Sequence, residues 1–100
     1  MNRNMQKMLR DAKALQDKLD KKLKEFESEE FQFDYKNTIK IRILGSCQIL
    51  KIEIDKQLID PDDKSMLEEM VVEAINEAYT AINNEKEEIT NQYMPNIPNF

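Results

Sequence analysis

The first quarter of the chain carries a single stripe of apolar residues at helical spacing. The apolar positions follow one another at intervals of three or four residues: Met1, Met5, Met8, Ala12, Leu15, Leu19, Leu23 and Phe26. This period predicts an amphipathic helix of the coiled-coil type. If residues 3–27 are all helical, the helix is about 37 Å long. A sheet of short strands cannot cover that length, so we expect part of the helix to project or to meet another helix.

After this stripe the apolar period changes from about 3.6 to 2, which predicts strands. Alternation is clear in Phe31–Tyr35, in Thr38–Leu44 and in Cys47–Ile54. Short connections between the three runs predict an antiparallel meander. One face of it is expected to carry the apolar side chains of the second and third strands: Ile39, Ile41, Ile43, Leu50, Ile52 and Ile54. A one-residue slip would turn these side chains to water, so the register is well specified.

Turn residues separate the predicted strands. Lys36-Asn37 connects the first two, and Gly45-Ser46 connects the second and third. Gly45 is the only glycine of the chain. We interpret it as the turn residue of the meander, and not as part of a phosphate-binding loop, because such loops need several glycines.

A second helix is predicted to begin at Asp60-Pro61, since aspartate caps helices and proline is favoured at the first helical position. Its apolar face extends from Met66 to Ile82, whereas Ile89 is the only apolar residue in 83–92. Prolines at 95 and 98 end the helical pattern. The sequence therefore predicts an α+β fold, with one domain over residues 1–94 and a flexible C-terminal tail over residues 95–100.

Charge is distributed unevenly along these elements. The 100 residues carry a net charge of −5, but residues 1–27 contain eight basic and five acidic side chains. Phosphate groups favour basic protein surfaces, so the first helix is the part of the chain suited to a nucleic-acid partner. No apolar run reaches the roughly 20 residues of a membrane span. The lone cysteine and the absence of a signal-peptide pattern predict a cytoplasmic protein with no membrane partner.

The residue types that build most active sites are scarce. The chain has no histidine and one cysteine, so common zinc sites and catalytic triads cannot be assembled within it. We interpret Cys47 as a small strand residue, with a nucleophile as the weaker alternative. The acidic cluster at residues 60–63 lacks the glycine and distal glutamate of a calcium loop, so helix capping is the better reading. We expect no enzymatic activity, cofactor, metal or small-molecule substrate.

Basic residues opposite the apolar stripe are the candidate DNA-binding residues. They could contact phosphates of a duplex without reading bases. Charged residues opposite an apolar stripe are, however, usually only a solvated surface, and that alternative stays open. The candidates are Arg3, Lys7, Arg10, Lys13, Lys18, Lys21 and Lys22.

Taken together, these segments resemble the YbaB/EbfC family of nucleoid-associated proteins over nearly the whole chain. The resemblance is carried by the opening helix NMQKMLRDAKALQDKL, the strand IKIRILG, and the strand end Ile52-Glu53-Ile54-Asp55. It continues through LIDPDDKSMLEEM, AINEAYTAI and the tail with its prolines. Six segments in the right order at the right spacing make the match specific, although none is strong alone.

The resemblance implies a homodimer in which the sheets and parts of the helices form the interface while the long helices project as two arms. It also implies binding of duplex DNA with low sequence specificity and a role in nucleoid organisation or gene regulation. Two departures stand out. The first two strands are joined by DYKNT where the family often has glycines, and the second helix is strongly acidic. The first helix must therefore supply most of the contacts with a duplex.

A protein–protein adaptor is the alternative function, because the net charge is negative. In that case the helices would bind a partner helix or a replication or recombination factor. The candidate apolar anchors are Met66, Met70, Ile97 and Phe100.

Overall fold

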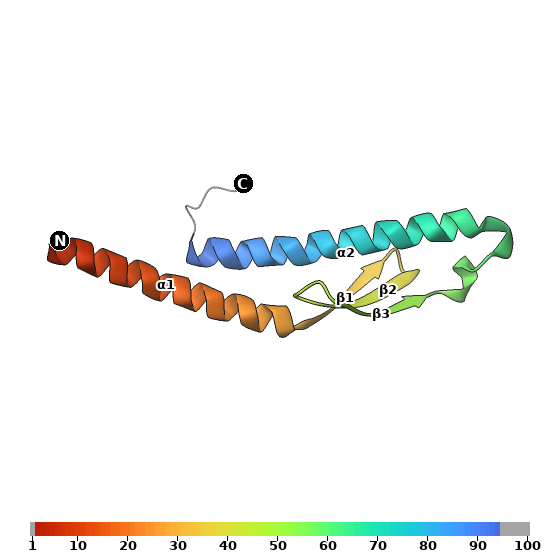
Figure 1. Cartoon of the computed structure of the whole chain (residues 1–100). Helices are drawn as coiled ribbons and strands as arrows, with labels where there is room; N and C mark the ends of the chain where they lie inside the picture. The colour runs from red at the N-terminus through yellow and green to blue at the C-terminus, as the bar shows by residue number, and fades with distance from the viewer. Residues whose placement is uncertain (1, 95–100) are drawn as a thin grey trace.

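The computed structural model describes residues 2–94 and confirms the predicted order of helix, three strands and helix (Figure 1). Helix α1 spans Arg3–Ser28 and helix α2 spans Lys64–Tyr93. Between them lie β1 (Glu30–Tyr35), β2 (Ile39–Leu44) and β3 (Ile49–Ile54), followed by the 3-10 turns η1 (Lys56–Leu58) and η2 (Pro61–Asp63). The predicted tail at residues 95–100 lies outside the described residues.

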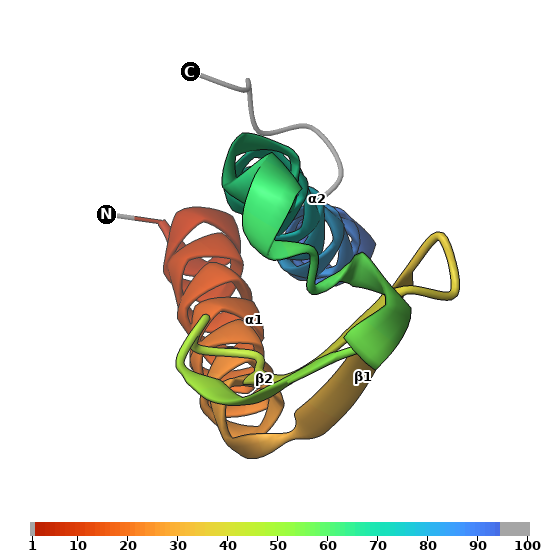
Figure 2. The same cartoon turned by 90° about the vertical axis from the view of Figure 1, so that its right-hand side faces the viewer.

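The elements form two layers in an elongated molecule. The sheet has the order β1-β2-β3 with antiparallel neighbours, and α2 covers one of its faces (Figures 1 and 2). Helix α1 runs antiparallel to α2 and overlaps with only part of it. The molecule measures 73 × 23 × 16 Å and has a radius of gyration of 19.8 Å, whereas a compact chain of this size has about 13 Å. The first half of α1 therefore lacks a packing partner within residues 2–94, whereas α2 packs from Met70 to Ile89.

The core lies where α2 crosses the central strand. The β2 residues Ile39, Ile41 and Ile43 are buried against Ala74 and Ala78 of α2. The small alanine side chains let the helix approach the sheet, and each buried isoleucine contributes about 1.5–3 kcal/mol. Core residues contributed by other elements are Phe26, Tyr35 and Ile82.

The third strand differs from the prediction in its start and in one side chain. It begins at Ile49 instead of Cys47, and an irregularity in the β2–β3 pairing shifts the register between Arg42 and Ile43. Ile43 consequently pairs with Ile49, which packs against the core, while Leu50 is exposed. The expectation that Leu50 shares the apolar face was wrong, because a bulge adds one residue and reverses the alternation.

One of the two predicted turns is confirmed, and the other contains its glycine for a different reason from the one expected. Lys36 and Asn37 both have positive φ, as the central residues of a type I′ turn require, which confirms that turn. Gly45, in contrast, does not have a positive φ. A Cβ atom at Gly45 would lie 2.0 Å from the carbonyl oxygen of Phe26. The glycine is therefore needed for the close approach of the β2–β3 connection to the end of α1, and not for the turn itself.

The start of the second helix is shifted by three residues from the prediction. Pro61 opens a 3-10 turn that is capped by Asp60, whose side chain accepts a hydrogen bond from the Asp62 amide at 2.9 Å. The α-helix begins at Lys64, and the Asp63 carboxylate accepts from the Met66 amide at 3.3 Å. The interpretation of this cluster as helix caps is confirmed, with two successive caps where one was expected.

Candidate nucleic-acid interface

Helix α1 consists of a packed half and an uncovered half. In the packed half Leu19 is 4% exposed and Phe26 is 2% exposed, because α2 and the sheet lie against them. In the uncovered half the same stripe continues through Leu15, Met8 and Met5, which are all exposed. Figure 1 shows the reason: α2 ends beside the middle of α1. We call residues 3–16 the arm.

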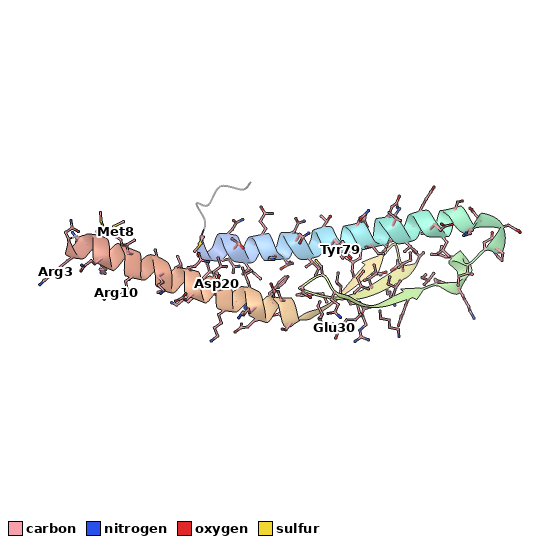
Figure 3. The ribbon with its side chains drawn as sticks, in the orientation of Figure 1. Arg3, Met8, Arg10, Asp20, Glu30 and Tyr79 are labelled. Atoms are coloured by element: carbon pink, nitrogen blue, oxygen red, sulfur yellow. The ribbon has the colours of Figure 1, made fainter. Side chains whose placement is uncertain are left out.

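Four of the seven candidate DNA-binding residues lie on the arm, and all four are exposed. They are Arg3, Lys7, Arg10 and Lys13. In Figure 3 the Met8 side chain points to the side of α1 on which α2 lies, and Arg10 points to the opposite side. Because the four cations follow one another at intervals of four, three and three residues along one helix, they lie on the side of Arg10, away from the rest of the molecule.

The other three candidates lie in the packed half, beside the end of α2. Lys18, Lys21 and Lys22 line a shallow hollow of about 180 Å³ together with Glu25 and Tyr93. The last turn of α2 contains no basic residue of its own. Cations near a helix C-terminus interact favourably with the helix dipole, and the hollow beside Tyr93 places these three lysines there, unlike the four arm residues.

The seven candidate side chains form no salt bridge among residues 2–94. The salt bridges in that part of the chain join Arg42 to Glu30, Lys51 to Glu53 at 3.0 Å, and Lys64 to Glu68 at 3.8 Å. The arm carries Asp11 as its single acidic residue. Its positive charge is thus not neutralised by the chain itself and is available to phosphate groups.

A second group of basic side chains, which the sequence reasoning did not single out, lies on the outward face of the sheet. Lys40, Arg42 and Lys51 are exposed there, and Arg42 is directly opposite Lys51 in the β2–β3 register. Acidic residues neutralise this group. Lys51 hydrogen-bonds to the carboxylate of Glu53 and attracts it electrostatically, which lowers the pKa of Glu53. The signal that could have identified the group is the alternation of lysine and arginine with isoleucine in the strands.

One buried polar contact joins the sheet to α2. The buried Tyr35 donates a hydrogen bond from its hydroxyl to the Glu73 carboxylate. This bond and the burial raise the pKa of Tyr35, while the Lys36 ammonium, 5.2 Å from the ring centre, opposes the rise. The contact positions α2 over the sheet.

The other residues that the sequence singled out differ in how exposed they are. Of the adaptor anchors, Met66 is exposed and Met70 packs against the core, while Ile97 and Phe100 lie outside the described residues. Cys47 is half-buried within the β2–β3 connection. Within residues 2–94, no three cysteine, aspartate or glutamate residues are placed to hold a metal ion. No helix in that range is long and apolar enough to cross a membrane.

Comparison with known proteins gives a consistent result. Residues 1–97 match the YbaB/EbfC DNA-binding family. A nucleoid-associated protein of Malacoplasma penetrans is 62% identical over 92% of this chain and 98% of its own length. A nucleoid-associated protein of Ureaplasma urealyticum is 37% identical over 97% of this chain and 98% of its own. These matches cover the arm, the sheet and α2 together, and the chain belongs to the YbaB/EbfC family of nucleoid-associated DNA-binding proteins.

Proposed function

We propose that this protein binds duplex DNA as a homodimer, with low sequence specificity, through phosphate contacts made by the basic side of the arm. The observation that carries the proposal is the exposed row Arg3, Lys7, Arg10 and Lys13, which forms no salt bridge within residues 2–94. Such contacts position a protein on DNA but carry no sequence information. Lys18, Lys21 and Lys22 are secondary contacts, because they also lie against the end of α2.

Low specificity follows from the arrangement of the cations and not from their residue types. Bases are read most often by arginine, lysine, asparagine or glutamine held in a groove by a helix or strand that enters it. The basic side of the arm offers long flexible cations spaced over about three helical turns, a geometry suited to tracking a backbone. This function would place the protein on the nucleoid in the cytoplasm, where it would organise DNA or influence transcription.

A salt titration tests the proposal directly. Each phosphate contact lowers the slope of log affinity against log salt by about 0.9. Replacing Lys7, Arg10 and Lys13 together by alanine should weaken binding to all duplexes alike. It should flatten the slope by about 3 for each arm that contacts the duplex, which is about 5 when both arms of the dimer do so. An affinity that does not depend on salt, or no binding at low salt, would overturn the proposal.

The chain offers a matched control for net charge. Lys40, Lys56 and Lys86 are exposed residues outside α1, and none of them forms a salt bridge within residues 2–94. Replacing these three by alanine changes the net charge by the same amount as the arm variant. The control should retain most of the affinity and nearly the full slope. Equal losses in the two variants would show that overall charge, and not the arm, determines binding.

A further inference from the structure

The end of α1 is held by the backbone of the β2–β3 connection. The Gly45 amide donates a hydrogen bond to the Glu29 carbonyl at 2.9 Å, and the Ser46 amide donates to the Glu27 carbonyl at 3.2 Å. Carbonyl groups at the end of a helix have no partner within the helix, so these two amides satisfy groups that α1 leaves open. We call this connection, residues 45–48, the clamp (Figures 1 and 2).

The clamp can lie this close to α1 only because it begins with a glycine. A Cβ atom at Gly45 would lie 2.0 Å from the carbonyl oxygen of Phe26, a core residue that is 2% exposed. Two hydrogen bonds also close the clamp on itself. The Cys47 amide donates to the Leu44 carbonyl at 2.8 Å, and the Leu44 amide donates to the Gln48 carbonyl at 2.9 Å. The clamp is therefore a tight loop that fixes the backbone at the end of α1.

Fixing this end determines the direction of the whole helix. The buried residues of α1 are Leu19 and Phe26, and residues 2–18 are all exposed. Contact at Leu19 alone would let the helix pivot, whereas two held points define its axis. Arg3 and Phe26 are about 35 Å apart along that axis, so a tilt of about 10° at Phe26 would move Arg3 by about 6 Å. This displacement exceeds the length of a charge-assisted hydrogen bond, which is about 2.8 Å.

We propose that the clamp sets the angle at which the four cations of the arm meet a duplex, and that Gly45 is a positioning residue for DNA binding. Duplex DNA is stiff, with a persistence length of about 150 base pairs, so a short duplex cannot bend to follow a misdirected arm. A single strand is flexible and can follow it. This inference rests on the proposed function, and it adds that the direction of the arm makes the protein prefer a duplex to a single strand.

The affinities for a short duplex and for an oligo(dT) single strand of the same charge test the inference. The arm, residues 3–16, has no aromatic side chain on which bases could stack, so oligo(dT) would meet it through phosphates alone. Gly45→Ala should weaken binding of the duplex by about tenfold, the equivalent of one charge-assisted contact, and leave binding of oligo(dT) nearly unchanged. Replacing Lys7, Arg10 and Lys13 by alanine should weaken both. Equal losses for duplex and oligo(dT) in Gly45→Ala would overturn the inference.

A second core variant controls for the lower stability of Gly45→Ala. Ile39 is fully buried and lies at the opposite end of β2 from the clamp. Ile39→Ala should destabilise the fold by a comparable amount without touching the end of α1. It should keep the wild-type ratio of the two affinities, measured where circular dichroism shows each variant to be folded. A ratio that falls as far in Ile39→Ala as in Gly45→Ala would show that stability, and not the clamp, causes the effect.

An insertion tests the same contact without adding a side chain to the clamp. Two glycines placed between Ser28 and Glu29 separate one of the two carbonyl acceptors from α1, and lengthening a connection costs little stability. This variant should also lose the preference for the duplex. An unchanged preference in the insertion variant would overturn the inference and leave the proposed function standing. A wild-type protein that binds neither the duplex nor oligo(dT) at low salt would overturn both.

Discussion

Replacing Gly45 by alanine should destabilise the protein strongly, because the β2–β3 connection passes directly over the last turn of α1. The added Cβ would lie 2.0 Å from the carbonyl oxygen, 2.7 Å from the carbonyl carbon and 2.9 Å from a ring carbon of Phe26. Two of these three atoms are backbone and cannot rotate away. One segment must therefore move by about an ångström relative to the other, since such contacts are essentially never shorter than about 3 Å.

The magnitude follows from what that movement would disrupt. Crowding of a well-packed site costs about 1–3 kcal/mol. The Gly45 amide donates to the Glu29 carbonyl at 2.9 Å and the Ser46 amide donates to the Glu27 carbonyl at 3.2 Å, and each such bond contributes about 1 kcal/mol. We expect Gly45→Ala to lower the free energy of unfolding by about 3–5 kcal/mol, a large part of the roughly 5–15 kcal/mol of a typical domain.

Urea denaturation followed by circular dichroism measures this change, and it should be repeated at several protein concentrations because dimerisation stabilises the folded state. Ser46→Ala, at the exposed neighbouring position, should stay within about 0.5 kcal/mol of the wild type. Gly45→Asn separates the two explanations of the glycine. Asparagine tolerates positive φ, so a glycine kept only for its turn would accept it. If Gly45→Asn were mild, or Gly45→Ala cost less than about 1 kcal/mol, the close approach to Phe26 would be refuted.

Three further predictions concern single contacts. Raising the pH above about 10 should reduce stability, because the hydrogen bond to Glu73 raises the pKa of Tyr35 in the folded state. The stabilisation by this bond is complete below the pKa of the unfolded state and is lost as the pH rises from there through the folded-state pKa. Tyr35→Phe should flatten this alkaline loss in pH-dependent unfolding, and an unchanged profile would contradict the assignment. Asn37→Ala should lower the free energy of unfolding by about 1 kcal/mol because Asn37 has a φ of 58°, whereas Asn37→Gly should not; equal losses would exclude φ as the cause. Removing the cap with Asp63→Ala should lower the melting temperature by the equivalent of about 1 kcal/mol, more than Asp62→Ala, and the reverse order would contradict the capping assignment.

Much of the fold was predictable because periodicity reflects burial. The change from a period of 3.6 to 2 after Phe26 located α1 and the sheet, and the isoleucines of β2 identified the core. The bulge before Leu50 was not predictable, because a run of two adjacent apolar residues, Ile49 and Leu50, fits either register. The role of Gly45 could not be predicted either. A side chain there is excluded by the carbonyl group of Phe26, which is distant in sequence and close in space.

The residues of the candidate site could be predicted from the sequence, but their separation into an arm group and a group beside the end of α2 could not. The sequence places all seven basic residues on one helix, outside the apolar stripe. It does not show where α2 ends against α1, and that position separates Lys18, Lys21 and Lys22 from the arm residues. The length of α2 and the offset between the helices are tertiary properties, set by packing of Ala78 and Ile82 on the sheet and α1.

The uncovered arm also determines how α1 loses its helical structure. An isolated peptide of about 14 residues is marginally helical in water, because the first turn fixes several residues in exchange for one hydrogen bond. The arm does not face that nucleation step, since it extends turns that Leu19 and Phe26 already hold in place. Its free end is fastened by the Asn2 side chain, which accepts a hydrogen bond from the Met5 amide at 2.8 Å. Unwinding should therefore begin at Asn2 and advance inward, so that amide exchange slows progressively from the tip of the arm to its base.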